Sequence, residues 1–197
     1  MRTRLVIATK NAGKVAELRE ALADLGFDVV SLLDLPSTKE IDEDAESFAG
    51  NATKKATEIS LAFSLATLAD DSGLEVDALG GAPGVHSARY GGPGLDDAAR
   101  NRLLLEALRD VPASARGARF RCAIAYAAPG ETPRLFEGVF PGRIAFTPRG
   151  RHGFGYDPIF TPEGYEISLA EIPPAEKLRV SHRARALAAF AHWVESR

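Results

Sequence analysis

Hydrophobic residues follow two different periods along the chain, and the points where the period changes divide it into short strands and longer helices. Short segments rich in apolar residues, RLVIAT at 4–9 and FDVVSL at 27–32, are typical of strands. Apolar residues three and four positions apart predict helices over 14–26 and 48–65. The first third of the chain is therefore expected to fold as strand, helix, strand and helix.

Strand-like patterns return in the middle of the sequence. A pair of strands is expected over 67–76, broken at Ser72–Gly73 because a serine–glycine step is a common turn signal. The segments 118–128 and 133–146 are rich in strand-forming residues and are separated by the turn sequence PGET. They are expected to form a hairpin, which would add an antiparallel part to the sheet.

Two further helices are expected, at 96–111 and at 181–196. Asp96 or Asp97 can cap the first, and Ser181 is a good N-cap for the second. The buried stripe of the closing helix is expected to consist of Leu187, Phe190, Ala191 and Val194. Glycine-rich loops fill 80–94 and 148–160, and long loops of this kind are often functional.

Strands separated by helices predict an α/β fold. No internal repeat or linker interrupts the 197 residues, so a single domain over 1–197 is expected. The net charge of −3 argues against a nucleic-acid-binding surface, so an anionic ligand would be held by a local cluster of bases or by a metal ion.

The same composition bears on location. A single cysteine, Cys122, allows no internal disulfide, which fits a reducing compartment. No apolar run approaches the roughly 20 residues that span a bilayer, and the first residues reach a polar loop too early for a signal peptide. We therefore expect a cytoplasmic protein without a membrane partner.

The stretch ATKNAGK joins the first strand to the first helix and has the composition of an anion site. Free amides at a helix N-terminus and the helix dipole favour negative charge. Thr9 and Asn11 add polar groups, and Lys10 and Lys14 add positive charge. With one glycine the loop matches neither the dinucleotide nor the Walker pattern, and a capped turn with solvated lysines is the alternative.

Acidic residues form two further candidates. Asp42, Glu43, Asp44 and Glu46 precede the long helix, either as an acidic first turn favoured by the dipole or as ligands of a hard cation such as Mg²⁺. In LADDSG, neighbouring strand residues point to opposite faces, so the two aspartates cannot share one target. Asp71, nearer the carboxyl end of the strand, is expected to face a ligand and Asp70 to be a structural brace.

The last candidates lie near the C-terminus. Phe154, between two glycines, can present its ring for stacking on a nucleobase. Lys177, His182 and Arg183 are cationic, and the last two lie in the first turn of the closing helix, where positive charge opposes the helix dipole. A ligand contact would explain this unfavourable placement, and a solvated polar turn is the alternative. The remaining histidines, expected to be structural or solvated, are His86, His152 and His192.

Five motifs together resemble the inosine triphosphate pyrophosphatase family, and they cover nearly the whole chain in the family's order. They are ATKNAGK, FxxNAxxKA from Phe48 to Ala56, ADDSGLEVDALGGAPGVHSARY, GFGYDPIF, and EK followed by SHR. The resemblance implies an elongated mixed central sheet flanked by helices, with two lobes and a cleft between them. It also implies a homodimer that, with Mg²⁺, hydrolyses ITP, dITP and XTP to the monophosphate and pyrophosphate.

The resemblance also assigns roles to residues. Asp71 is similar to the family's general base and metal-linked aspartate, with Ser72 beside it contacting substrate. The metal would further be held by Asp42 or Glu43. The remaining substrate-binding residues implied are, for the triphosphate, Thr9, Lys10, Asn11, Ala12, Gly13, Lys14 and Lys55, and, for the base, Phe154, Gly155, Tyr156, Asp157, Lys177, His182 and Arg183.

The chain departs from the family pattern before the long helix. The family usually has Glu-Thr-Gly-x-Thr-Phe, whereas this chain has Ala45 at the glycine and Ser47 at the second threonine. Gly50 stands where a glutamate is common. The carboxylate chemistry survives these changes, and either Asp42 or Glu43 remains available to a metal ion.

Two other functions stay open. A related pyrophosphatase for modified pyrimidine nucleotides shares a similar fold, although the cluster of Lys177, His182 and Arg183 favours a purine. Among purines, a 6-oxo group can accept from Lys177 or Arg183, whereas the 6-amino group of adenine would leave that donor unpaired. A nucleotide-binding module without activity is the other alternative. The carboxylates argue against it, since anion binding gains nothing from them.

Overall fold

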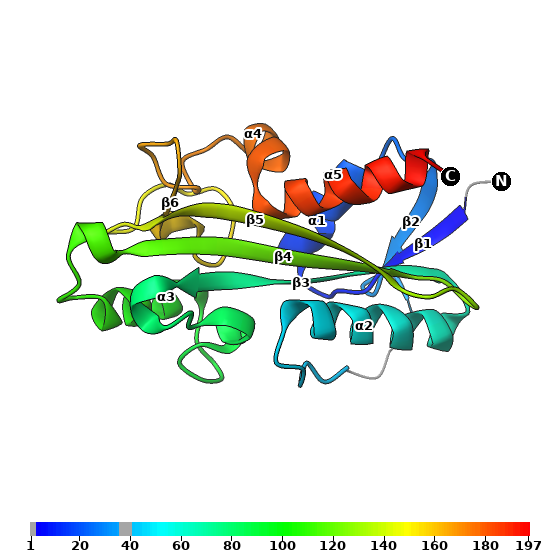
Figure 1. Cartoon of the computed structure of the whole chain (residues 1–197), viewed down its shortest axis with the longest axis horizontal. Coiled ribbons are helices and arrows are strands. Elements are labelled where there is room, and N and C mark those ends of the chain that lie inside the picture. The colour runs from blue at the N-terminus through cyan, green and yellow to red at the C-terminus, as the bar shows by residue number, and fades with distance from the viewer. Residues whose placement is uncertain (1–2, 36–40) are drawn as a thin grey trace. The chain divides into compact units, whose positions relative to one another are not determined.

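Six strands form one sheet in the order β2-β1-β3-β4-β5-β6 in the computed structural model, which describes residues 3–35 and 41–197 (Figure 1). The strands are β1 (Thr3–Ile7), β2 (Phe27–Ser31), β3 (Ala66–Val76), β4 (Gly117–Ala127), β5 (Arg134–Ile144) and β6 (Phe160–Pro162). β1 pairs in parallel with β2 and β3, and β5 pairs antiparallel with β6. The predicted α/β fold with a mixed sheet is therefore confirmed.

The helices are α1 (Ala12–Leu22), α2 (Phe48–Phe63), α3 (Asp97–Ala107), α4 (Pro174–Val180) and α5 (His182–Glu195). The described chain divides into two compact units, the first of residues 1–71, 122–138 and 183–197, and the second of residues 72–121 and 139–182. β3, β4 and β5 each contribute residues to both units. No helix in the described ranges is both long and apolar enough to cross a membrane.

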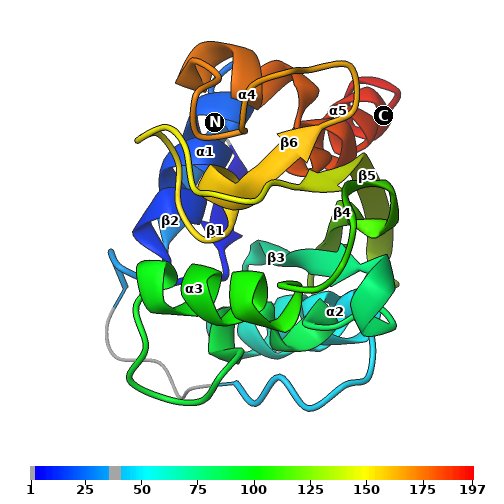
Figure 2. The same ribbon diagram turned by 90° about the vertical axis from the view of Figure 1, so that its left-hand side faces the viewer.

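In the first unit, strand alternation sends side chains to two differently covered faces. α1 and α5 lie on one side of the strands and α2 on the other (Figures 1 and 2). Leu5 and Leu68 belong to the buried cluster that also holds Leu18 of α1 and Phe190 of α5. Even-numbered residues of β3 up to position 70 therefore face α1 and α5, and its odd-numbered residues face α2.

The second unit has its own buried core around the distal halves of the long strands. Leu74 of β3, Phe120 of β4 and Phe140 of β5 pack in one cluster with Leu104 of α3 and Phe160 of β6. The rings of Phe120 and Phe160 meet edge to face at 4.7 Å between centroids. This core supports the loop that carries Phe154–Asp157, because Tyr156 is one of its buried members.

Three details differ from the sequence-based expectations. β3 runs without interruption through Ser72–Gly73, because Ser87 Oγ accepts a hydrogen bond from the Leu74 amide at 2.8 Å and so satisfies the backbone after the glycine. The loop over 80–94 contains a 3₁₀ helix at Gly84–Arg89. A short helix, α4, precedes the closing helix, and Ser181 is extended between the two (φ −66°, ψ 167°).

Other boundaries agree with the patterns. Asp96 caps α3, its Oδ1 accepting from the Ala99 amide at 2.7 Å, which settles the choice left between Asp96 and Asp97. Of the expected stripe of α5, Phe190 and Leu187 are buried, whereas Ala191 and Val194 are only partly buried. Ala186, which was not expected in the stripe, is fully buried. Residues 36–40, the first part of the polar stretch before α2, lie outside the described residues.

Candidate functional site

The loop between β1 and α1 is shaped by two side chains of its own sequence. Asn11 caps α1, and its Oδ1 accepts from the Lys14 amide at 3.0 Å. Thr9 Oγ1 accepts from the Asn11 amide at 3.2 Å. The first amides of α1, at Ala12 and Gly13, have no acceptor within the helix and point out of its N-terminus, as an anion site requires.

Asp70 lies on the face of β3 that is covered by α1 and α5. Its carboxylate forms ion pairs with Lys14 of α1 and with Arg183 of α5, the latter at 3.1 Å between Nε and Oδ2. Arg183 also pairs with Glu17, and the Cys122 thiol donates to Asp70 Oδ2 at 2.9 Å. The expectation that Asp70 is a structural brace is confirmed by these contacts.

Electrostatics in this cluster favour ionised partners. Burial alone would raise the pKa of Asp70, but Arg183 and Lys14 hold that pKa well below its ordinary value. The neighbouring thiol responds in the opposite direction, because burial and the Asp70 charge raise the pKa of Cys122 well above its usual range. Asp70 is thus a buried anion between two cations, and Cys122 is a neutral donor to it.

Asp71 lies on the opposite face, which α2 covers. Asn51 Nδ2 donates to its Oδ2 at 3.0 Å, and Lys55 Nζ lies 3.8 Å from its Oδ1. Lys55 also donates to the Asp70 carbonyl oxygen and to Glu43 Oε1, both at 2.8 Å. Burial, only partly offset by Lys55, raises the pKa of Asp71 above its ordinary value.

Asn51 connects this aspartate to the acidic segment before α2. Its Oδ1 accepts from the Ala45 amide at 2.9 Å while its Nδ2 donates to Asp71. Asn51 belongs to the motif FxxNAxxKA, but it is not among the site residues expected from the sequence. Its spacing of four residues from Lys55 on one helix, which places both side chains on the same face, is the signal that could have found it.

Residues that depart from the family pattern meet in space at the start of α2. Ser47 caps the helix, its Oγ accepting from the Gly50 amide at 3.1 Å. A Cβ on Gly50 would lie 2.8 Å from Ala45 Cβ, too close for two carbon atoms. Ala45 and Gly50 therefore fit against one another. Because residue 50 is a glycine, the helix has no glutamate that could complete a capping box with Ser47.

The acidic residues beside α2 are the candidate ligands of a metal ion. Within residues 3–35 and 41–197, no group of three or more His, Cys, Asp or Glu side chains is arranged to hold one. Glu43 and Asp71 nevertheless converge on the same Lys55 ammonium, whereas Asp42 is exposed. Mg²⁺ is commonly bound by one or two carboxylates together with substrate phosphates and water, so this pair fits its chemistry.

A second group of predicted residues lies in the second unit, around the turn Phe154–Asp157. Asp157 Oδ2 accepts from Lys177 Nζ at 2.7 Å and from the Phe154 amide at 2.9 Å. Lys177 Nζ also lies 4.8 Å from the centre of the Phe154 ring, within cation–π range. Lys177 and Asp157 are 4% and 3% exposed, so this is a buried ion pair beside an aromatic face.

Gly153 makes that pair possible. It has φ +76°, a conformation that favours glycine, and a Cβ there would lie 1.9 Å from Asp157 Oδ2 and 3.1 Å from Lys177 Nζ. The glycine-rich loop predicted at 148–160 thus owes this glycine both to its backbone conformation and to the close approach of a carboxylate.

The remaining predicted residues lie in separate places. His182 is buried and stacks on Phe120, with 4.7 Å between ring centroids and 11° between planes. Tyr156 donates to the Ser87 carbonyl oxygen at 2.9 Å, and burial raises its pKa above the ordinary value. Ser72 follows Asp71 in β3 and is the first residue of the second unit. Arg183 belongs to the first unit, unlike Lys177 and His182.

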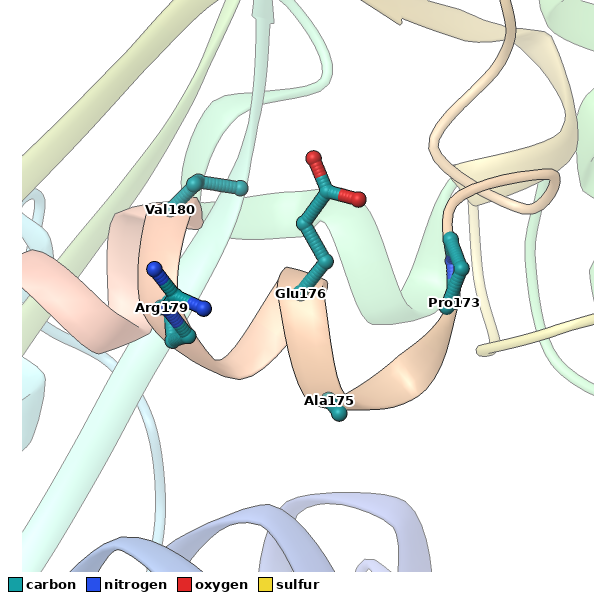
Figure 3. A pocket seen from close by; sticks show the side chains of 5 residues that line it. All are labelled: Pro173, Ala175, Glu176, Arg179 and Val180. Atoms are coloured by element: carbon teal, nitrogen blue, oxygen red, sulfur yellow. The ribbon is translucent and has the colours of Figure 1, made fainter.

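A pocket of about 420 Å³ lies along α4 and the residue before it (Figure 3). It is lined by Pro173, Ala175, Glu176, Arg179 and Val180. Glu176 Oε1 accepts from the Tyr165 hydroxyl at 2.9 Å. None of the lining residues was predicted to bind substrate, so the pocket is distinct from the residues that the sequence pointed to.

An open helix N-terminus beside lysines and carboxylates in one unit, and a cation on an aromatic ring in the other, are features of nucleotide-binding α/β proteins. The comparison with protein families gives this class a closer definition. The chain belongs to the Ham1 family, whose model matches residues 5–193. This membership confirms the family resemblance drawn from the five sequence motifs.

Similar proteins and structures extend over almost the full length. A dITP/XTP pyrophosphatase of Oceanobacillus iheyensis is 43% identical over 194 residues, covering 98% of each chain. The structure of a HAM1 protein from Coxiella burnetii has a TM-score of 0.90 and 39% identity, covering 99% of this chain and 100% of that one. A nucleoside-triphosphatase and dITP/XTP pyrophosphatase from Mycobacterium abscessus has a TM-score of 0.79 and 47% identity, covering 95% and 98%.

Proposed function

We propose that this chain is a nucleoside-triphosphate pyrophosphatase that hydrolyses the 6-oxo purine nucleotides ITP, dITP and XTP to the monophosphate and pyrophosphate. The observation that carries the proposal is the cluster of Asp71, Asn51, Lys55 and Glu43 in a member of the Ham1 family. Relatives 43–50% identical over nearly their whole length are named dITP/XTP pyrophosphatase. Removal of such nucleotides would keep deaminated purines out of DNA and RNA.

The triphosphate is proposed to bind at the loop between β1 and α1. Its residues Thr9 to Lys14 supply helix amides, and the lysines supply charge against the roughly four negative charges of a nucleoside triphosphate. Lys14 is held by Asp70, and Lys55 is held by Glu43 and by the Asp70 carbonyl oxygen. Both ammonium groups are therefore fixed before a phosphate arrives, which lowers the cost of ordering them.

Asp71 is proposed as the general base that positions the attacking water. Its raised pKa brings its basicity closer to neutral pH, and the bond from Asn51 fixes the orientation of the carboxylate. Mg²⁺, held by Asp71 and by Glu43 in preference to the exposed Asp42, would supply charge neutralisation at the phosphates. As the water attacks the α-phosphorus, Asp71 accepts its proton, and the bond from the α-phosphorus to the α–β bridging oxygen breaks to release pyrophosphate.

The base is proposed to bind at Phe154–Asp157 with Lys177 and His182. The Phe154 ring offers a stacking face, and beside it lies the Lys177 ammonium, whose N–H donors match a 6-oxo group. Arg183 uses its two described bonds on carboxylates of the first unit, so we propose that it acts by bracing Asp70. Its predicted contact with the purine stays a prediction, as does a contact of Ser72 with substrate.

The decisive experiment is a substrate panel with product identification. The wild-type protein is incubated with Mg²⁺ and ITP, dITP, XTP, ATP, GTP or a methylated pyrimidine triphosphate. The proposal expects pyrophosphate and the monophosphate from the first three. Orthophosphate with the diphosphate would contradict it, a preference for the methylated pyrimidine would favour the alternative pyrophosphatase, and ITP binding without turnover would favour a binding module.

Two controls sharpen the assignments. Glu43→Gln is expected to raise the Mg²⁺ concentration that gives half-maximal turnover, whereas Asp42→Asn is expected to leave it unchanged. The opposite result would assign the metal to Asp42. The family resemblance further predicts a homodimer, and the composition predicts a cytoplasmic location. The mass of the protein in solution, measured by light scattering, tests the dimer.

A further inference from the structure

Two side chains of helix α3 bind the two polar backbone groups of Gly155, its N–H and its C=O. Asp97 Oδ2 accepts a hydrogen bond from the Gly155 amide at 2.7 Å. Asn101 Nδ2 donates to the Gly155 carbonyl oxygen at 3.0 Å. Asp97 and Asn101 are four residues apart on α3, so both side chains leave the same face of the helix.

Gly155 is a position where the backbone would otherwise be free to move. Its φ of +63° favours glycine, yet a Cβ there would meet nothing within 4 Å. The glycine is therefore required by conformation and not by packing, and no side chain of its own holds it in place. The two bonds from α3 hold the two peptide groups on either side of the Gly155 Cα, one through its N–H and the other through its C=O.

Asn101 fits this purpose better than a purely structural one. It is 4% exposed, and its Oδ1 is buried without a hydrogen-bond partner among the described residues. Such an acceptor carries a desolvation cost that an apolar side chain of similar size would avoid. Packing alone therefore does not account for an asparagine at this position, whereas its bond to Gly155 does.

The neighbours of Gly155 are held as well, and each by a different element. Tyr156 donates to the Ser87 carbonyl oxygen, and Asp157 pairs with Lys177. The bonds at Gly155 complete a run of three anchored residues just after the Phe154 ring. A shift of this turn would move Phe154 and Asp157 together, because the Phe154 amide donates to the Asp157 carboxylate.

We propose that Asp97 and Asn101 are positioning residues for purine recognition, which hold the turn Phe154–Asp157 in the form that selects a 6-oxo base. This inference rests on the proposed function, since it assigns the base to that turn. It adds to selectivity two positioning residues on a helix that supplies no group of the proposed substrate contacts.

The test compares variants of α3 with the wild-type protein. Asn101→Leu removes the donor to Gly155 and keeps a side chain of similar volume. Asp97→Ala removes the acceptor at an exposed position where folding is not at risk, and Asp97→Asn restores an acceptor there. Arg102→Gln, exposed on the same helix, is the matched control.

Calorimetric binding of IMP and of pyrophosphate with Mg²⁺ separates base from phosphate recognition. Asn101→Leu and Asp97→Ala are expected to weaken IMP binding about tenfold and to leave pyrophosphate binding within about twofold of the wild type. They should also raise the KM for ITP more than they lower kcat, and reduce the preference for ITP over ATP. Asp97→Asn and Arg102→Gln should behave as the wild type.

Unchanged IMP affinity and unchanged preference in a folded Asp97→Ala protein would overturn the inference. An equal loss of IMP and pyrophosphate binding would also overturn it, because it would indicate a general structural role. Failure of the proposed function is seen earlier and separately: a wild-type protein that binds no IMP and releases no pyrophosphate from ITP would reject both.

Discussion

The Arg183 guanidinium lies 3.1 Å, from Nε to Oδ2, from the Asp70 carboxylate, and both side chains are almost completely buried. Asp70 also pairs with Lys14, and Arg183 with Glu17, so four charges from α1, β3 and α5 form one network in the first unit. Because a buried charge without a partner is costly, each member depends on the others. Lys14, which belongs to the proposed phosphate loop, takes its position from this network.

Replacing Asp70 by asparagine tests the network. Asp70→Asn is expected to lower the free energy of unfolding by about 3–5 kcal/mol at pH 7, because it removes the buried negative charge that Lys14 and Arg183 share. The folded-state pKa of Asp70 lies below its unfolded value, so its contribution is present above about pH 4 and is lost as the pH falls through the folded pKa. Denaturant unfolding at several pH values measures both effects.

The same pair of residue types on the surface provides the control. Asp28 pairs with Arg4 at 3.0 Å, with both side chains about half exposed. Asp28→Asn is therefore expected to cost less than about 1 kcal/mol. Equal costs for the two variants, or a difference between wild type and Asp70→Asn that grows below about pH 4, would contradict the brace.

Replacing Asp71 should affect activity and spare the fold. Asp71→Asn is expected to reduce turnover of ITP by about 10²–10⁴-fold, as the loss of a general base does. Because burial raises the pKa of Asp71, the ionised side chain lowers the free energy of unfolding at neutral pH. A neutral amide at this position removes that cost. Thermal unfolding should therefore show no loss of stability, and near-normal turnover would refute the assignment.

Asn51 is expected to act through Asp71. Asn51→Asp removes the donor to Asp71 and places a second carboxylate beside it. We expect turnover to fall about 10–100-fold, with a higher Mg²⁺ requirement, as for other residues that orient a metal ligand. Glu58→Gln, exposed on the same helix, is the control, and a Mg²⁺ titration of turnover is the measurement. Equal behaviour of the two variants would leave Asn51 without this role.

Gly153 separates a backbone effect from a steric one. Gly153→Ala would put a Cβ 1.9 Å from Asp157 Oδ2 and should part Lys177 from Asp157, weakening IMP binding as well as stability. Gly164 also has a positive φ, of +83°, but open space around it. Gly164→Ala should cost only about 1–2 kcal/mol of backbone strain and leave IMP binding intact. Calorimetry and thermal unfolding of both variants would expose a shared loss of binding, which the steric argument does not allow.

A double substitution tests the fit between Ala45 and Gly50. Gly50→Ala improves helix propensity by about 1 kcal/mol, yet its Cβ would lie 2.8 Å from that of Ala45. We expect the single variant to be less stable than the wild type, and Ala45→Gly with Gly50→Ala to recover that loss. Unfolding free energies from one double-mutant cycle decide the matter, and additive effects would show that the two positions are independent.

Local sequence patterns are sufficient to predict a structural feature wherever that feature depends on a single strand or helix. The period of two in β3 predicts that Asp70 and Asp71 face opposite ways, and their partners on α1, α5 and α2 confirm it. Asp96 as an N-cap follows from the same kind of short-range rule. The family motifs likewise depend on local spacing, and the match of the Ham1 family model over residues 5–193 confirms the resemblance that they carry.

Contacts between distant segments lie beyond such rules. Glu17 and Arg183 are 166 positions apart, and no local pattern pairs them. The predicted break at Ser72–Gly73 is wrong for the same reason, since the hydrogen bond to the Leu74 amide just after it comes from Ser87 in the 3₁₀ helix at Gly84–Arg89. Asn101 carries no sequence signal toward Gly155, 54 positions away.

Because side chains alternate along β3, the register of this strand decides which face each aspartate occupies. Loss of one residue between Ala66 and Asp70 would move Asp71 to the position of the brace, facing Arg183, and would leave Ser72 at the position of the base. Gain of one residue would move Asp70 to the position of the base, facing Asn51, and would leave Ala69 at the position of the brace. Substitutions in this strand can be compensated one at a time, whereas a change in its length alters both functions at once.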